Sequence, residues 1–398
     1  MTPDTTMPGG RNRKAALAAL ASLVVIGVAA LAGCTSSSSS SASSSPAGSS
    51  AGSSANADSV LSTAAESNPN IDLGSSEGNA PAPDFRLVNQ FGQAMSLSQF
   101  RGKVILLSFE DPDCTDVCPL TTQSMVQAKD LLGKAGTAVQ LLGVNVNPGA
   151  TATSDVLGYS RAHGMVNQWD FLTGSAAQLK KVWTAYHIEV AVEKGDIDHT
   201  PALFVIDQQG RLQKVYLTQM AYSSVGQDAQ VVAEEVSSLL PSHPKLASLQ
   251  SLAAIAPQDP TAHVTLPAFG GGSVALGPGQ PRLVVFFATW LSETSDFSAE
   301  MTELNSYAKA ASARHLPQLT AVDEMVTEPS AAAVTTTLHG LGTLDYPIGI
   351  DDTGRVADGY GAQDQPWLVL VNSAGKVTWQ NDGWLPLPAL EAAAAAHP

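Results

Sequence analysis

Cysteine is scarce in this chain of 398 residues, which contains only Cys34, Cys114 and Cys118. Three cysteines cannot build a disulfide-stabilised scaffold. Charged residues make up only 14% of the chain, and 20 Lys and Arg stand against 36 Asp and Glu, for a formal net charge of −16. Since so little positive charge does not suit phosphate neutralisation, we expect no nucleic-acid partner. Hydrophobic residues, at 44%, are numerous enough for buried cores, and the length favours two or three domains.

The N-terminus has the order of an export signal. Basic residues at positions 11, 13 and 14 precede an uncharged apolar run over residues 15–32. A permanent membrane span needs about 20 apolar residues. We therefore expect a signal peptide over residues 1–33, with an uncleaved transmembrane anchor as the alternative. Residues 31–34 (LAGC) resemble the bacterial lipobox, which implies lipidation of Cys34 and an extracytoplasmic protein anchored to the bacterial cell membrane.

A tether follows the expected anchor. Residues 34–80 are rich in Ser, Ala and Gly up to about residue 58, which predicts disorder, and we expect the folded chain to begin near Ala80. If lipid consumes Cys34, Cys114 and Cys118 are the remaining thiols. They would then lie outside the cytoplasm, where disulfides persist.

The rest of the chain divides into two similar halves. Strand and helix patterns alternate through residues 81–242, which predicts a central mixed sheet with helices on both faces. A buried strand is expected at residues 103–109 (KVILLSF), followed by a helix over residues 121–132. After a linker at residues 243–263, the order repeats in residues 264–398, where residues 283–288 (LVVFFA) parallel the first strand. The pattern indicates two domains of one α/β fold.

The candidate chemistry of the first half centres on residues 111–119 (DPDCTDVCP). Pro119 suits the first turn of a helix, which places Cys118 at a helix N-terminus and Cys114 one turn upstream. Partial positive charge and free N–H groups at that terminus are expected to lower the pKa of the thiols. Two thiolates at this spacing can close into a disulfide or chelate one soft metal ion, and Cu(I) suits them best.

His199 is the best candidate for a third copper ligand, because it precedes the strand that is expected beside the cysteine loop. Its neutral imidazole would also tolerate Cu(II). A structural disulfide and a metal-free redox pair remain open alternatives, whereas zinc is disfavoured because structural zinc needs four ligands. His163 and His187 fall within helical stretches and are expected to be ordinary residues.

At these positions the first half resembles the Sco/SenC family, thioredoxin-fold copper proteins that serve cytochrome c oxidase assembly. The resemblance implies copper binding at Cys114, Cys118 and His199, and copper delivery to, or thiol reduction of, the dinuclear copper site of oxidase subunit II. Residues 147–151 (NPGAT) depart from the family, which usually has an Asp-Pro pair and a second acid there. The resemblance rests on Asp84-Phe85, Gly102-Lys103, Phe109, the Cys-x-x-x-Cys-Pro motif, residues 171–174 (FLTG), Val182-Trp183, Asp198-His199, Ile206-Asp207 and Gly210-Arg211.

The second half is similar to a membrane-anchored thioredoxin of the cytochrome-maturation type, which implies a fold class of two tandem thioredoxin-like domains. Leu291 and Thr294 occupy the positions of the two cysteines of such proteins, so dithiol chemistry is excluded there. Pro366 stands where that fold keeps its cis-proline. We expect a redox-inert domain with a structural or partner-binding role. Three nearby polar residues are expected on a solvated helix face rather than in a polar site: Glu293, Asp296 and His315.

The sequence favours a copper metallochaperone, in which Cu(I) held by Cys114, Cys118 and His199 passes to oxidase subunit II or another cuproprotein by ligand exchange. The alternative is an extracytoplasmic thiol–disulfide oxidoreductase, in which the Cys114/Cys118 pair cycles with thiol–disulfide partners. A third hypothesis is an interaction scaffold built on the second half.

Overall fold

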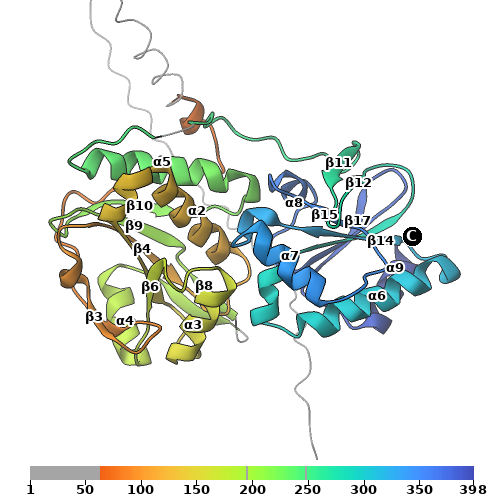
Figure 1. The fold of residues 1–398 in the computed structure, drawn as a ribbon, viewed down its shortest axis with the longest axis horizontal. Helices are drawn as coiled ribbons and strands as arrows, with labels where there is room; N and C mark the ends of the chain where they lie inside the picture. Colours follow the sequence, from red (N-terminus) through yellow and green to blue (C-terminus); the bar gives the residue numbers. More distant parts are fainter. Residues whose placement is uncertain (1–62, 194–195, 247–248) are drawn as a thin grey trace, which may run out of the picture. The chain divides into compact units, whose positions relative to one another are not determined.

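The computed structural model describes residues 63–193, 196–246 and 249–398, which carry two separate main sheets (Figure 1). These described residues form one compact unit. We call residues 63–240 the N-terminal lobe and residues 264–396 the C-terminal lobe. The expected signal peptide, the lipidated Cys34 and most of the expected tether lie outside the described residues. Among the described helices, none is long and apolar enough to cross a membrane.

The N-terminal lobe is built on a six-stranded sheet with the order β1-β10-β9-β4-β5-β6. β4 pairs in parallel with β5, and β5 with β6, whereas β9 runs antiparallel to β4. The strands are β1 (Ser75–Ser76), β4 (Val104–Glu110), β5 (Val139–Asn145), β6 (Trp169–Leu172), β9 (Ala202–Ile206) and β10 (Leu212–Leu217). The helices are α2 (Val117–Leu131), α3 (Thr153–Ala162), α4 (Ala176–Ala185) and α5 (Val225–Leu239), with short 3-10 turns η1 (Leu97–Phe100), η2 (Gly133–Ala138) and η3 (Tyr222–Ser224).

The central strand β4 explains why this sheet is covered on both faces. Successive side chains of a strand point to opposite faces. Val104 and Leu106 pack in the core that includes residues of α2, α3 and α5, whereas Ile105 and Leu107 pack in the core that includes residues of α4. A strand buried on both faces reads as a continuous apolar run, and for that reason its position was predictable.

The C-terminal lobe repeats this arrangement on a five-stranded sheet with the order β15-β14-β13-β16-β17. β13 and β14 are parallel, as are β14 and β15, and β16 runs antiparallel to β13. The strands are β13 (Arg282–Phe287), β14 (Gln318–Asp323), β15 (Ile348–Ile350), β16 (Trp367–Val371) and β17 (Val377–Asp382). The helices are α6 (Phe297–Arg314), α7 (Ala331–Gly340), α8 (Arg355–Gly359) and α9 (Leu387–Ala396), with 3-10 turns η4 (Thr289–Glu293) and η5 (Met325–Thr327).

Three small hairpins complete the described fold. β2 (Arg86–Val88) pairs with β3 (Ala94–Ser96), and β11 (Val264–Pro267) pairs with β12 (Ser273–Leu276). The third hairpin pairs β7 (Val190–Glu193) with β8 (Asp196–His199). This last hairpin was not anticipated from the sequence, although it carries the candidate ligand His199.

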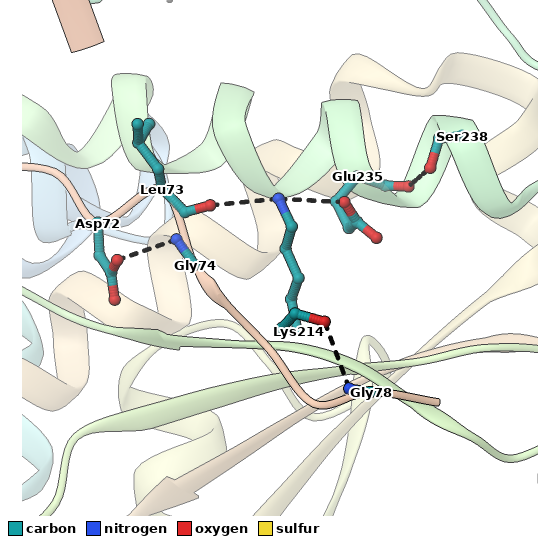
Figure 2. Close-up of polar contacts among 8 residues, drawn as sticks. Asp72, Leu73, Gly74, Gly78, Lys214, Glu235 and Ser238 are labelled. Atoms are coloured by element: carbon teal, nitrogen blue, oxygen red, sulfur yellow. Dashed lines mark hydrogen bonds and ion pairs between the residues drawn. The ribbon is translucent and has the colours of Figure 1, made fainter. Parts of the chain in front are cut away.

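The folded chain begins earlier than the boundary expected near Ala80. Ala65 and Ile71 are buried in the core, and β1 pairs with β10. Lys214 on β10 links the segment before β1 to α5 (Figure 2). Its Nζ donates to the carbonyl oxygen of Leu73 and forms an ion pair with Glu235 on α5, both at 3.3 Å. The residues before 81 that the structure describes therefore belong to the N-terminal lobe.

The expected linker is tied to both lobes. Its described residues within 241–263 carry no helix or strand. Gln227 on α5 donates through Nε2 to the carbonyl oxygens of Ser251 and Ala253, at 2.6 and 2.9 Å. Further along, the Gln258 amide donates to the carbonyl oxygen of Arg355 at 2.8 Å. These contacts fix the course of the connection between the lobes.

Candidate metal centre

Cys114 lies in the loop between strand β4 and helix α2, and Cys118 lies in the first turn of that helix. Asp116 caps the helix, and its Oδ1 accepts hydrogen bonds from the Val117 amide at 2.6 Å and from the Cys114 thiol at 2.8 Å. The Cys118 amide donates to the Cys114 sulfur at 3.3 Å. A free N–H of the first helical turn, which has no partner within the helix, therefore finds one in the loop. The arrangement brings the two cysteines together at the N-terminus of α2, as expected.

His199 reaches the same place from the end of strand β8. Its Nε2 lies 3.6 Å from the Cys118 sulfur. Its Nδ1 lies 3.1 Å from the carbonyl oxygen of Thr200, which can only accept, so the proton belongs on Nδ1. Nε2 then carries the free lone pair and is the nitrogen that could bind a metal. The structure thus brings His199 to Cys118, as the sequence pattern predicts.

The described residues do not yet form a complete ligand cage. Both Cys114 and Cys118 are free thiols. Within the part of the chain that the structure describes, no group of three or more His, Cys, Asp or Glu side chains is arranged to hold a metal ion. The Cys114 thiol is instead engaged by Asp116. Binding by all three candidate ligands would therefore require that hydrogen bond to break.

The expected lowering of the thiol pKa is wrong. Burial raises the pKa of Cys114 to about 12 and raises that of Cys118 well above its ordinary value. Desolvation disfavours a charged thiolate, and here it outweighs the partial positive charge of the helix N-terminus. Burial lowers the pKa of His199, although its bond to Thr200 and nearby carboxylates oppose this shift. Without a metal, the site therefore holds two neutral thiols and a neutral imidazole at neutral pH.

Sequence reasoning missed Glu110, the last residue of β4. This side chain is buried, and burial raises its pKa to about 8, while hydrogen bonds from Ser108 and Cys118 partly oppose the rise. A charged residue at the end of an otherwise apolar buried strand is the signal that could have found it. Glu110 adds a carboxyl group that contacts the Cys118 thiol.

Asn147 gives a physical reason for the departure from the family pattern. Its Nδ2 donates to Asp111 Oδ1 at 2.8 Å and to Asp113 Oδ2 at 3.2 Å. The pKa values of both aspartates are raised, mainly by burial. An acid at position 147 would face two carboxylates, whereas the amide satisfies them. In this chain Asp111 and Asp113 of the cysteine loop supply the carboxyl groups next to position 147.

The two histidines expected to be ordinary residues, His163 and His187, differ in their burial. His187 is exposed with a positive φ of 57°, outside the site. His163 follows α3 and is buried, and within the described chain neither of its ring nitrogens has a hydrogen-bond partner. Neither residue is placed with the cysteines.

In the C-terminal lobe, Leu291 is buried and the Gln365–Pro366 peptide bond is cis, as expected from the position of Pro366. Thr294 and Glu293 are exposed. Asp296 caps the start of α6 and His315 its end. Since 18 helical residues span about 27 Å, these last two side chains cannot share a site.

Residues 74–234 match the family model described as SCO1/SenC, which is less than half of the chain. The N-terminal lobe is therefore a SCO1/SenC domain, and its strand order is that of the thioredoxin-like fold expected from the resemblance. The family resemblance stated from the motifs is confirmed for this part of the chain.

Curated relatives match the same part. A SCO2-like protein of Rickettsia felis is 25% identical over 138 residues, which are 33% of this chain and 66% of that protein. The mitochondrial SCO2 homolog of Bos taurus is 27% identical over 147 residues, 33% of this chain and 52% of that protein. The chain thus spans less than two thirds of the length of these relatives. The solved structure of Bradyrhizobium japonicum ScoI with copper bound is 23% identical, with a TM-score of 0.35, and covers 40% of this chain and 100% of its own.

Proposed function

We propose that this protein is a copper metallochaperone, which delivers copper to, or matures, the dinuclear copper site of cytochrome c oxidase subunit II. One observation carries the proposal: Nε2 of His199, with its lone pair free, lies 3.6 Å from the Cys118 sulfur. Sulfur and imidazole ligands suit Cu(I). The SCO1/SenC match of the N-terminal lobe supports copper as the cargo.

The chemistry of the donor set fits a cargo that must be released. Two thiols and one imidazole leave a soft monovalent ion with few ligands, so an acceptor can take it over by ligand exchange. Metal binding requires deprotonated thiolates, and the raised pKa values of Cys114 and Cys118 keep both thiols protonated without a metal. We further propose that lipid on Cys34 anchors the protein outside the cytoplasm, where it can reach a membrane-bound acceptor.

Copper transfer tests this function. The full chain, loaded with one equivalent of Cu(I) under anaerobic conditions, is mixed with the soluble copper domain of an oxidase subunit II, and copper in each protein is measured after separation. We expect transfer from the wild-type protein and a large loss of transfer from His199→Ala. His187→Ala is the matched control, because His187 is an exposed histidine of the same lobe. Equal transfer by the two variants would exclude His199 as a ligand.

A thiol–disulfide oxidoreductase is the second candidate. It is favoured by the contact of 3.3 Å between the Cys118 amide and the Cys114 sulfur, which keeps two free thiols within local reach. This function predicts turnover of a disulfide substrate that survives both His199→Ala and a copper chelator. Copper transfer without such turnover would reject it.

A further inference from the structure

The C-terminal lobe carries a surface at the edge of its sheet where open α/β sheets generally place their ligands. Ligands of such sheets bind outside the carboxyl ends of the strands. In this lobe η4 follows β13 directly, and η5 follows β14. Trp290 of η4 is nevertheless buried, and its Nε1 donates to Thr327 of η5 at 3.3 Å. A buried tryptophan at this edge means that protein atoms already cover it.

The covering atoms include residues of the N-terminal lobe. The ring of Trp290 lies 4.6 Å from the ring of His163, measured between centroids. Next to it, Pro329 packs so closely on Gly164 that a Cβ added to this glycine would lie 2.8 Å from the Pro329 Cβ. Ala162, at the end of α3, is buried in the core of the C-terminal lobe. These contacts form an apolar junction with the end of α3.

A second junction is polar and is made by Asp358 of α8. Its carboxylate accepts hydrogen bonds from the amides of Tyr222 and Ser223, at 2.8 and 3.1 Å, and from the Ser223 hydroxyl. Burial raises the pKa of Asp358, and these bonds oppose the rise. A carboxylate that accepts three hydrogen bonds at the start of a helical segment is a strong, directional contact. Asp358 therefore joins the C-terminal lobe to η3 of the N-terminal lobe.

The contacts continue to the cysteine loop. Leu120, in the first turn of α2, is buried with residues of β13, β16 and α8. Gln123 of α2 donates to the carbonyl oxygen of Thr327 at 3.5 Å. Thr115, which lies between the two cysteines, hydrogen-bonds Asp364, the residue immediately before the Gln365–Pro366 bond. The C-terminal lobe thus touches the loop that carries Cys114 and the helix that carries Cys118.

We propose that the C-terminal lobe is a built-in partner of the cysteine loop: its ligand is the surface of α2, α3 and η3, and its binding there restrains the loop and limits access to the two thiols. The contacts of Trp290, Asp358 and Asp364 identify this surface as the one that the C-terminal lobe binds. The lobe lacks its own cysteines, so it can hold this surface without exchanging disulfides with it. This inference does not depend on copper, and it gives the redox-inert lobe a specific role.

The test measures thiol access in the full chain. N-ethylmaleimide labelling is followed by mass spectrometry of the tryptic peptide 104–129, which lies between Lys103 and Lys129 and contains both cysteines but not Cys34. One variant combines Trp290→Ala with Asp358→Ala to weaken the junctions. A second, Asp364→Ala, removes the contact to Thr115 of the loop together with the hydrogen bond from the Gln365 amide. Asp352→Ala is the control, because Asp352 is an exposed acid near Asp358.

We expect both variants to increase the labelling rate about tenfold. Cys118 is buried and Cys114 is half-buried, and access to covered thiols follows the population of open states. The double junction variant should also increase hydrogen exchange at residues 221–224, and the control should change neither quantity. Thr115→Val should speed labelling as Asp364→Ala does, and combining the two should add little, as for two ends of one contact. Unchanged labelling rates, unchanged exchange at residues 221–224, or additive effects of the Thr115 and Asp364 changes would each overturn the proposal. Circular dichroism and thermal melting verify that each variant is folded.

Discussion

At the start of α2, two opposing effects act on the thiols of Cys114 and Cys118. The helix N-terminus favours the thiolate, whereas burial favours the neutral thiol. The pKa of Cys114 is raised to about 12 and that of Cys118 is also raised, so burial wins. His199 has a lowered pKa and is neutral at pH 7. Without a metal, both thiols therefore carry protons, which a metal must displace.

Proton release on copper binding is the first prediction. At pH 7 both thiols are protonated and the imidazole is not, so binding by all three groups should release about two protons per Cu(I). Anaerobic calorimetry in buffers of different ionisation enthalpy measures this number. Release of about one proton or fewer would mean that one of the thiols does not bind as a thiolate.

Asn147→Asp is the second prediction at this scale. The new carboxylate would replace an amide that donates to Asp111 and Asp113, so it should destabilise the fold by about 2 kcal/mol at pH 7. Three facing carboxyls in the folded state would hold protons to higher pH than in the unfolded state. The loss should therefore shrink as pH falls and one carboxyl becomes protonated.

Urea unfolding at pH 5 and pH 8 measures the effect of Asn147→Asp. Asn147→Ala is the control, because it removes the hydrogen bonds donated to Asp111 and Asp113 without adding charge, and its loss should depend less on pH. A destabilisation that is the same for both variants at both pH values would contradict the electrostatic explanation.

At the scale of elements, long apolar strands and amphipathic helices were predictable, and short elements were not. The expected helix over residues 121–132 is α2, which begins at Val117 because Asp116 caps it. β14 mixes polar and apolar residues, and β15 has only three residues, so the place of these strands depends on pairing with β13 and β14. The hairpin of β7 and β8 was missed for the same reason. His199 could be selected only from its place in the motif, since a three-dimensional contact with Cys118 has no local signal.

His163, at the end of α3, yields a prediction for acid stability. Burial lowers its pKa to about 3, and its ring faces the rings of Tyr159 and Trp290. Between pH 6.5 and about 3 the unfolded chain binds a proton here that the folded chain does not. The stability due to this group is therefore lost as pH falls, with a limiting slope of about 1.4 kcal/mol per pH unit.

His163→Phe keeps an aromatic ring and removes this titration. The unfolding free energy of the wild type minus that of the variant should decrease with this slope as pH falls below about 6. Chemical unfolding measures both free energies. His187→Phe is the control, because His187 is exposed and its replacement should leave the acid limb unchanged. Parallel pH profiles for wild type and His163→Phe would contradict a buried neutral histidine.

At the scale of the whole molecule, the repeat of one strand order in two lobes was predictable, and the contact between them was not. The repeated strands β4 and β13, and likewise β9 and β16, are apolar runs, so these strands could be recognised in the same order along both halves. The contact depends on residues such as Ala162, Gly164 and Asp358, which have no common sequence signal. The early start of the fold was also not predictable. Ala65 and Ile71 are buried in the core, but they lie in a stretch rich in polar residues.

The central claim is that two sulfurs and one imidazole from separate parts of the N-terminal lobe bind one soft ion. Anaerobic Cu(I) titration of the full chain, followed by X-ray absorption spectroscopy, tests it most directly. We predict one bound copper per chain with two sulfur neighbours and one nitrogen neighbour, loss of the nitrogen in His199→Ala, and loss of binding in Cys114→Ser and Cys118→Ser. A copper environment that is identical in wild type and His199→Ala, or no binding at one equivalent, would contradict the account.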